Sequence, residues 1–193
     1  GSVHGSGPIA VAHGKSDFTW KVLNTGHEDP QKRDAIFLLR KDKEHNWKII
    51  ATHFYEPGDA LPDDKDKINQ LLKAWEASLG KGEKTTEKHM DAFSQSYSQQ
   101  AVEIFPNQVS NIGMANLRSR LQQMEGTAME RNTLGSLGIE VRGRKAVAWG
   151  IGNQHYYPKD SKELRQNEFP WAMILTREKD EVWRILAIHW GGN

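Results

Sequence analysis

Residues 169–190 read FPWAMILTREKDEVWRILAIHW, and this stretch decides the fold class. Two apolar runs flank the charged residues 178–181. Apolar side chains that alternate over a short run are typical of β-strands, and a short polar break between two such runs indicates a hairpin. We therefore expect an antiparallel hairpin with one apolar face, formed by Phe169, Trp171, Met173 and Leu175.

The closing strand of this hairpin has a counterpart 136 residues earlier in the chain. Residues 47–53 read WKIIATH and residues 183–189 read WRILAIH, while AVAHG at 10–14 aligns with AVAWG at 146–150. Starting at residue 9, the ungapped alignment has ten identities in 45 positions, where typical composition gives about three by chance. The order of the matches and their apolar positions favour a duplication.

Only the second copy follows an N-terminal half, which spans residues 65–144. We therefore expect that the natural protein is longer and that this sequence begins inside a first domain. The alternative is a half-domain that evolved as an added sheet layer. The expected organisation is the strand half of one unit at 8–56, a linker at 57–66 and a complete domain at 67–193.

The remaining periodicity predicts helices and strands in separate blocks. Apolar residues at helical spacing predict helices at 65–79, 86–97 and 113–124, and a short strand at 101–105. A period of two then predicts one long strand at 137–157, bent at Gly150 or Gly152, and first-copy strands near 9–23, 35–40 and 47–55. Helices followed by antiparallel strands indicate an α+β fold, with the helices on one face of a curved sheet.

The composition excludes several classes of protein. The 193 residues are 37% hydrophobic, the mean hydropathy is −0.73, and no window approaches the run of about 18 apolar residues that a spanning helix needs. We therefore expect no membrane partner. The formal net charge of +1 argues against nucleic acid as a partner. The absence of cysteine excludes disulfides and thiolate chemistry.

Other motifs are missing as well. The sequence has no phosphate-binding glycine loop, no GxSxG and no HExxH, so we expect no cofactor and no metal. No signal peptide is visible, and a cytoplasmic location is favoured over export of a bacterial-type protein whose leader has been removed.

Four segments together resemble the NTF2-like (SnoaL-like, ketosteroid isomerase-like) superfamily. They are HMDAF at 89–93 with Tyr97, the strand AVEIFP at 101–106, the helix after Gly113, and the closing WRILAIH at 183–189. The resemblance covers 65–190 as a full domain and 8–56 as the C-terminal half of another. It implies a cone, in which a curved antiparallel sheet wraps three N-terminal helices and a pocket opens at the wide end.

The superfamily includes isomerases, dehydratases, epoxide hydrolases, polyketide cyclases and non-catalytic binding domains, so the fold alone does not choose a function. Its members often dimerise through the open sheet face. The resemblance therefore implies either a homodimer or intramolecular packing of the two repeats against each other.

The position that supplies the general base in the isomerases carries Phe105, which cannot accept a proton. The candidate acid–base residues are Glu103, His155 and His189. Glu103 shares a strand face with Phe105 if the strand is regular, and the alternative is that it reaches solvent at an edge. His189, which matches His53 in the repeat, is either a proton shuttle or a packed core residue.

Alternation places several aromatic and polar side chains where they could line a pocket. The predicted ligand-binding residues are Trp149, Asn153, His155, Tyr157, Trp171, Met173 and His189. The alternatives are plain core for the apolar residues and a solvated strand end for the polar ones. We expect a module that binds a small apolar or aromatic molecule, or a protein partner, without catalysis. The alternative is a small isomerase, cyclase or dehydratase that uses the histidines or Glu103.

Overall fold

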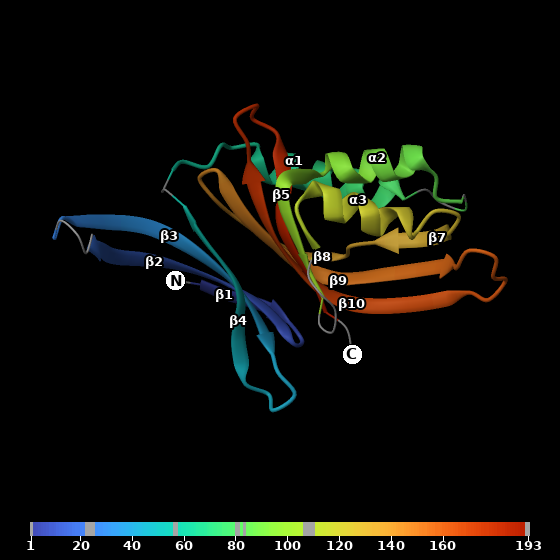
Figure 1. The fold of residues 1–193 in the computed structure, drawn as a ribbon, viewed down its shortest axis with the longest axis horizontal. Coiled ribbons are helices and arrows are strands. Elements are labelled where there is room, and N and C mark those ends of the chain that lie inside the picture. Colours follow the sequence, from blue (N-terminus) through green and yellow to red (C-terminus); the bar gives the residue numbers. More distant parts are fainter. Residues whose placement is uncertain are drawn as a thin grey trace.

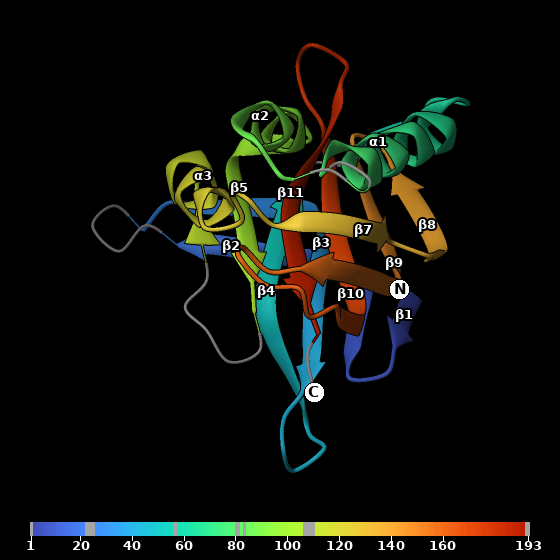
Figure 2. The ribbon, with the colours of Figure 1, turned by 90° about the vertical axis from the view of Figure 1, so that its right-hand side faces the viewer.

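The computed structural model describes residues 2–21, 26–55, 58–79, 82, 84–105 and 111–191. Two sheets and three helices form its layers. Figure 1 shows the helices on one face of the larger sheet and the smaller sheet on the opposite face. Figure 2 views the helical side, where α1 to α3 spread across the strands of the larger sheet.

The smaller sheet has the order β1-β2-β3-β4 and is antiparallel throughout. Its strands are β1 (Ser2–Ser6), β2 (Ile9–Lys21), β3 (Glu28–Lys41) and β4 (Trp47–Tyr55).

The larger sheet has the order β6-β5-β11-β10-β9-β7, and β8 also pairs with β9. Its ladders are antiparallel except for β5 with β11, which run parallel. The strands are β5 (Tyr97–Ile104), β6 (Asn111–Ile112), β7 (Ala128–Thr133), β8 (Ser136–Arg142), β9 (Lys145–Tyr157), β10 (Arg165–Arg177) and β11 (Trp183–Trp190). The helices are α1 (Asp64–Ser78), α2 (Glu87–Gln95) and α3 (Met114–Gln122).

Helix α1 lies on the larger sheet because its apolar residues share one stripe. Ile68, Leu72 and Trp75 are four and seven residues apart and are all buried. Its first residue, Asp64, is also buried and accepts hydrogen bonds from Arg177 and Trp183 at 2.9 Å. This ion pair joins the start of the helix to the β10–β11 hairpin.

The α+β fold with three helices is confirmed, and one predicted strand is wrong. The period-two stretch at 137–157 is two strands, β8 and β9, because the chain turns at Gly143. Gly143 has a φ of 59°, which favours glycine, and this turn replaces the expected bend at Gly150 or Gly152. Strands β1, β6 and β7 were not predicted.

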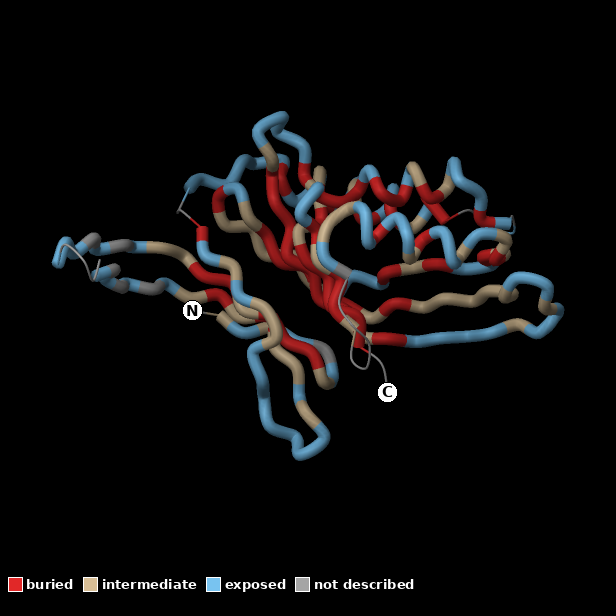
Figure 3. The backbone as a smooth tube through the Cα atoms, in the orientation of Figure 1, coloured by how far each residue is buried: buried red, intermediate tan, exposed pale blue. Residues whose placement is uncertain are grey.

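Two apolar cores lie on the two faces of the larger sheet. One packs the sheet against the helices and includes Met173 and Ile185. The other packs it against the smaller sheet and joins Val11 and Leu38 to Val147 and Ile174. Figure 3 shows the buried band running through the larger sheet between these two layers.

Strand pairing in the smaller sheet recurs 136 residues later. Val11 pairs with Leu38 as Val147 pairs with Ile174, and the β1–β2 ladder has the register of the β8–β9 ladder. Even the register shift recurs, because it falls after Leu38 in one hairpin and after Ile174 in the other.

Among the described residues, no helix has the length and apolar character needed to cross a membrane.

Candidate functional site

A cavity of about 580 Å³ opens where the helices meet the ends of the central strands. Its wall combines aromatic side chains from the core with polar side chains from the β9–β10 end, as is typical of small-molecule sites. The lining residues are Trp75, Leu79, Phe93, Phe105, Arg120, Met124, Gln154, Gln166, Asn167, Glu168, Phe169, Trp190 and Gly191.

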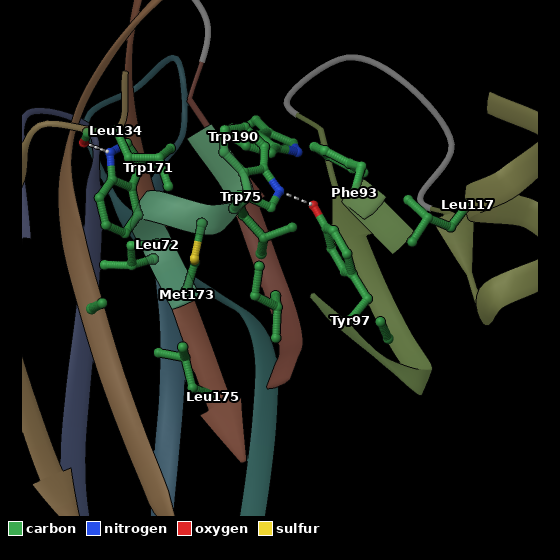
Figure 4. Close-up of a cluster of buried hydrophobic side chains, with 14 of the residues drawn as sticks. Leu72, Trp75, Phe93, Tyr97, Leu117, Leu134, Trp171, Met173, Leu175 and Trp190 are labelled. Carbon is green, nitrogen blue, oxygen red and sulfur yellow. Dashed lines mark hydrogen bonds between the residues drawn. The ribbon is translucent and has the colours of Figure 1, made fainter. Parts of the chain in front are cut away.

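Three aromatic rings form the floor of this cavity. Trp75 from α1 lies with its ring centroid 4.9 Å from that of Phe93 and 5.6 Å from that of Trp190 (Figure 4). Phe169 meets Trp190 edge to face at 5.4 Å. Strand β9 makes room for Phe169 with Gly152, where any side chain would collide with the phenyl ring. These contacts fix the rings as a rigid apolar surface.

Arg120 from α3 supplies the one cation among the described lining residues. Its Nε and Nη2 donate to the two carboxylate oxygens of Glu103 at 2.6 and 2.8 Å. The Glu103 side chain is only 1% exposed, whereas that of Arg120 is 24% exposed. The guanidinium carbon also lies 5.5 Å from the ring centroid of Phe105, within cation–π range.

A chain of hydrogen bonds continues from Glu103 into the core. The Tyr97 hydroxyl donates to Glu103 at 3.3 Å. It accepts a hydrogen bond from the Trp75 indole at 3.1 Å (Figure 4). Burial, reinforced by the Glu103 carboxylate, raises the pKa of Tyr97 well above its usual value. Tyr97 therefore remains a neutral donor, and with Arg120 it orients the buried carboxylate.

Arg120 presents a donor that a molecule in the cavity can reach, whereas a second donor without a partner is enclosed in the core. Among the described residues, Arg120 Nη1 has only a weak contact, at 3.9 Å, with the Met124 sulfur. The Trp190 indole nitrogen is buried and has no hydrogen-bond partner in the described part of the chain. A bound acceptor oxygen would satisfy Nη1 of Arg120, because a desolvated polar group without a partner costs free energy. The site can thus hold an apolar body that carries an oxygen acceptor.

The predicted ligand-binding residues of β9 lie on the face of that strand that points away from the helices. Trp149 packs in the core between the two sheets, and alternation places Asn153, His155 and Tyr157 on its side. Gln154, on the opposite face, lines the cavity instead. The neighbouring Glu130 carboxylate raises the pKa of Tyr157.

Trp149 belongs to a polar cluster where β1 meets β8. Its ring stacks on His4 at 4.4 Å, and His4 contacts Glu140 at 2.8 Å. Glu140 also accepts hydrogen bonds from Ser2 and Arg142. Burial opposes ionisation of Glu140, but the bonds from Arg142 and Ser2 outweigh it and lower its pKa to about 2. This cluster fastens the smaller sheet to the larger one.

The other predicted residues are buried outside the cavity lining. His189 is fully buried and donates from Nδ1 to the Ile104 carbonyl oxygen at 3.1 Å. Burial lowers its pKa to about 4. Trp171 and Met173 lie in the helix-side core, where the Trp171 indole donates to the Leu134 carbonyl oxygen.

The structure therefore brings Glu103 and Phe105 together around Arg120, but not with the histidines. The cavity is lined by Arg120, Trp75 and Trp190, and none of these three was predicted as a site residue. Trp75 had the clearest signal, since it lies on the apolar stripe of a predicted helix. Among the described residues, no group of three or more histidine, aspartate or glutamate side chains could hold a metal ion.

The fold of this chain is similar to those of several solved structures. A ketosteroid isomerase-like protein from Erwinia carotovora matches with a TM-score of 0.52 and 11% identity, over 65% of this chain and 90% of that one. An NTF2-like protein of unknown function from Prochlorococcus matches at 0.53 and 12% identity, over 67% and 94%. The chain has an NTF2-like fold.

A third structure with this fold widens the range of named roles. It is a putative Ca/calmodulin-dependent kinase II association domain from Exiguobacterium sibiricum, with a TM-score of 0.54 and 15% identity over 69% of this chain and 96% of that one. No protein-family model matches the sequence, and no curated protein matches it. At identities of 11–15%, these structures establish the fold alone. The function must be argued from the residues of the site.

Proposed function

We propose that the protein binds a small aromatic molecule bearing a carboxylate or carbonyl oxygen in the cavity between α1, α3 and the β9–β10 end, without catalysing its conversion. The aromatic floor of Trp75, Phe93 and Trp190 supplies apolar area for a planar body. The observation that carries the proposal is Arg120, a partly exposed cation held beside the aromatic part of the cavity wall.

Arg120 is well suited to recognise an acceptor oxygen. Glu103 holds the guanidinium through Nε and Nη2, so Nη1 is presented in a fixed orientation. A hydrogen bond from a charged donor is stronger than one from a neutral donor. The same bond is stronger inside a partly desolvated cavity than in water. An aromatic carboxylate should therefore bind more tightly than the bare hydrocarbon.

Two features favour binding over acid–base catalysis. Phe105 stands where the resemblance to isomerases places the base, and it has no group that can accept a proton. Both oxygens of the nearby Glu103 carboxylate are bonded to Arg120. Glu168, which supplies the one carboxylate among the described lining residues, is exposed to solvent.

Native mass spectrometry of the protein as purified, beside its denatured mass, tests this proposal. We expect a retained small molecule, or a one-to-one complex after addition of 2-naphthoate. A protein that carries no small molecule and forms no naphthoate complex would overturn the proposal.

A further inference from the structure

The two faces of the smaller sheet differ sharply in how they are covered. One face packs on the larger sheet, and the other is open to solvent. Trp47 and Ile49 of β4 are 46% and 60% exposed, whereas their counterparts 136 residues later, Trp183 and Ile185, are 3% and 0% exposed. Figure 3 shows β4 as a largely tan and blue segment, while β11 is almost entirely red.

The open face keeps the side chains that helices cover in the larger sheet. Five helix-side core residues of the larger sheet have an identical residue at the counterpart position of the smaller sheet. These pairs are Ala10 and Ala146, Ala12 and Ala148, Leu39 and Leu175, Trp47 and Trp183, and Ile49 and Ile185. Val3, 71% exposed, extends the same face on β1. Ala10 is itself buried, but Val3, Trp47 and Ile49 are exposed, and a patch of exposed apolar side chains marks an interaction site.

The edge of the smaller sheet carries a second, independent sign. Strand β11 pairs in parallel with β5, with Ile185 opposite Tyr97 and Ala187 opposite Val102. Strand β4 has the same register on β3 as β11 has on β10, but within the described residues it has no partner on its other side. An unpaired edge of this length offers backbone donors and acceptors to an incoming strand.

We propose that the open face and free edge of β4 form a docking surface for a polypeptide with the chemistry of residues 58–137. Such a partner lays amphipathic helices on Trp47, Ile49 and Leu39, as α1 to α3 lie on the larger sheet. Its following strand then pairs in parallel with β4, as β5 pairs with β11. The smaller sheet, formed by strands between residues 2 and 55, is then the strand half of a second NTF2-like unit.

The test uses the full chain with its own segment as the occupant. A copy of residues 58–137 is joined ahead of Ser2, because residue 138 is the counterpart of Ser2 at the offset of 136. Hydrogen exchange is then followed at the amides of β4 in the parent and the extended chain. We expect exchange to slow at least about tenfold in β4 and the added helices to be protected.

Substitutions separate docking on this face from general effects. Ile49→Glu in the extended chain should restore fast exchange in β4. Val182→Glu should not, since Val182 is similarly exposed, at 47%, but lies in the β10–β11 turn region outside the face. If the seamless join disturbs the parent fold, a flexible Gly/Ser linker of about 15 residues gives the same readout.

Two results would overturn the proposal. The added segment could remain unprotected while β4 exchanges as in the parent chain. Alternatively, sedimentation of the parent chain could reveal a dimer that Ile49→Glu dissociates and Val182→Glu does not, which would assign the face to a second copy of the chain.

Discussion

Arg120 and Glu103 form a two-pronged ion pair at the boundary between core and cavity, with N to O distances of 2.6 and 2.8 Å. The carboxylate is buried and the guanidinium reaches the cavity. Because the Glu103 carboxylate is enclosed and the Arg120 guanidinium is not, the pair holds the guanidinium in one orientation beside the aromatic wall of the cavity.

The first prediction concerns this pair. Arg120→Leu should lower the free energy of unfolding by about 3–5 kcal/mol, because it leaves a buried carboxylate without its counter-charge. Arg118→Leu, two residues earlier on α3, removes only an exposed pair with Asp91 and should cost less than about 1 kcal/mol. Urea denaturation measures both. Equal losses in the two variants would contradict the inward role of Arg120.

Asp64 and its neighbour Asp63 provide a second comparison. Asp64 is buried against Arg177 and Trp183, whereas Asp63 is exposed and pairs with Lys67. Asp64→Ala should cost about 3–5 kcal/mol, because the buried Arg177 charge keeps only the exposed Glu181 carboxylate, 3.3 Å from its Nε. Asp63→Ala should cost less than about 1 kcal/mol. Thermal or urea unfolding of the two variants distinguishes them. A small loss for Asp64→Ala would contradict this prediction and show that Glu181 alone compensates the Arg177 charge.

A third prediction follows from His189. Burial lowers its pKa to about 4 from the ordinary value of 6.5, against the effect of its bond to Ile104 and aided by Arg40. The unfolded chain therefore binds a proton before the folded chain does, so stability is lost as the pH falls from about 6.5 to 4. The loss from this one group is roughly 3 kcal/mol.

His189→Asn tests that assignment because its amide can still donate to the Ile104 carbonyl oxygen. The free energy of unfolding should then fall less steeply between pH 6.5 and 4, while His53, whose pKa burial also lowers to about 4, keeps part of the dependence. An unchanged pH profile in this variant would show that His189 does not control it.

Ile49 and Ile185 give a fourth prediction. Ile185→Ala should destabilise the fold by about 2–5 kcal/mol, because it leaves a cavity in the helix-side core. The same substitution at Ile49, which is 60% exposed, should cost less than about 1 kcal/mol. The denaturant midpoints of the two variants measure the difference between these losses of stability. A comparable loss at Ile49 would mean that this side chain is covered.

Local periodicity predicted the helices and the closing hairpin because their apolar residues point to one core. It failed at Gly143, since a two-residue turn between strands of the same period leaves the alternation almost unbroken. The alternation also grouped Trp149 with Asn153 and His155. It could not show whether that face of β9 packs against the helices or against the smaller sheet. Both faces of β9 are covered near Val147 and Ala148, so apolar content does not distinguish them.

Tertiary contacts explain why Arg120 was missed. It is a charged residue on a helix, and nothing in its neighbourhood distinguishes it from solvent-facing Arg118. Its significance comes from Glu103, 17 residues away, and from aromatic residues of α1 and β11. The sequence did point to Glu103 and Phe105, because Glu103 lies near the end of β5 and Phe105 directly follows that strand.

The cavity can be tested directly by calorimetric titration with 2-naphthoate, with naphthalene as the uncharged comparison. We compare the parent chain with Gln166→Trp, which fills the cavity mouth, and with Gln70→Trp, an exposed position on α1 outside it. We expect one saturable site for naphthoate in the parent chain and in Gln70→Trp, and binding at least about tenfold weaker in Gln166→Trp. Naphthalene should bind more weakly than naphthoate. Equal naphthoate affinity in all three proteins would contradict binding in this cavity. Equal affinity for naphthoate and naphthalene would contradict recognition of an acceptor oxygen by Arg120.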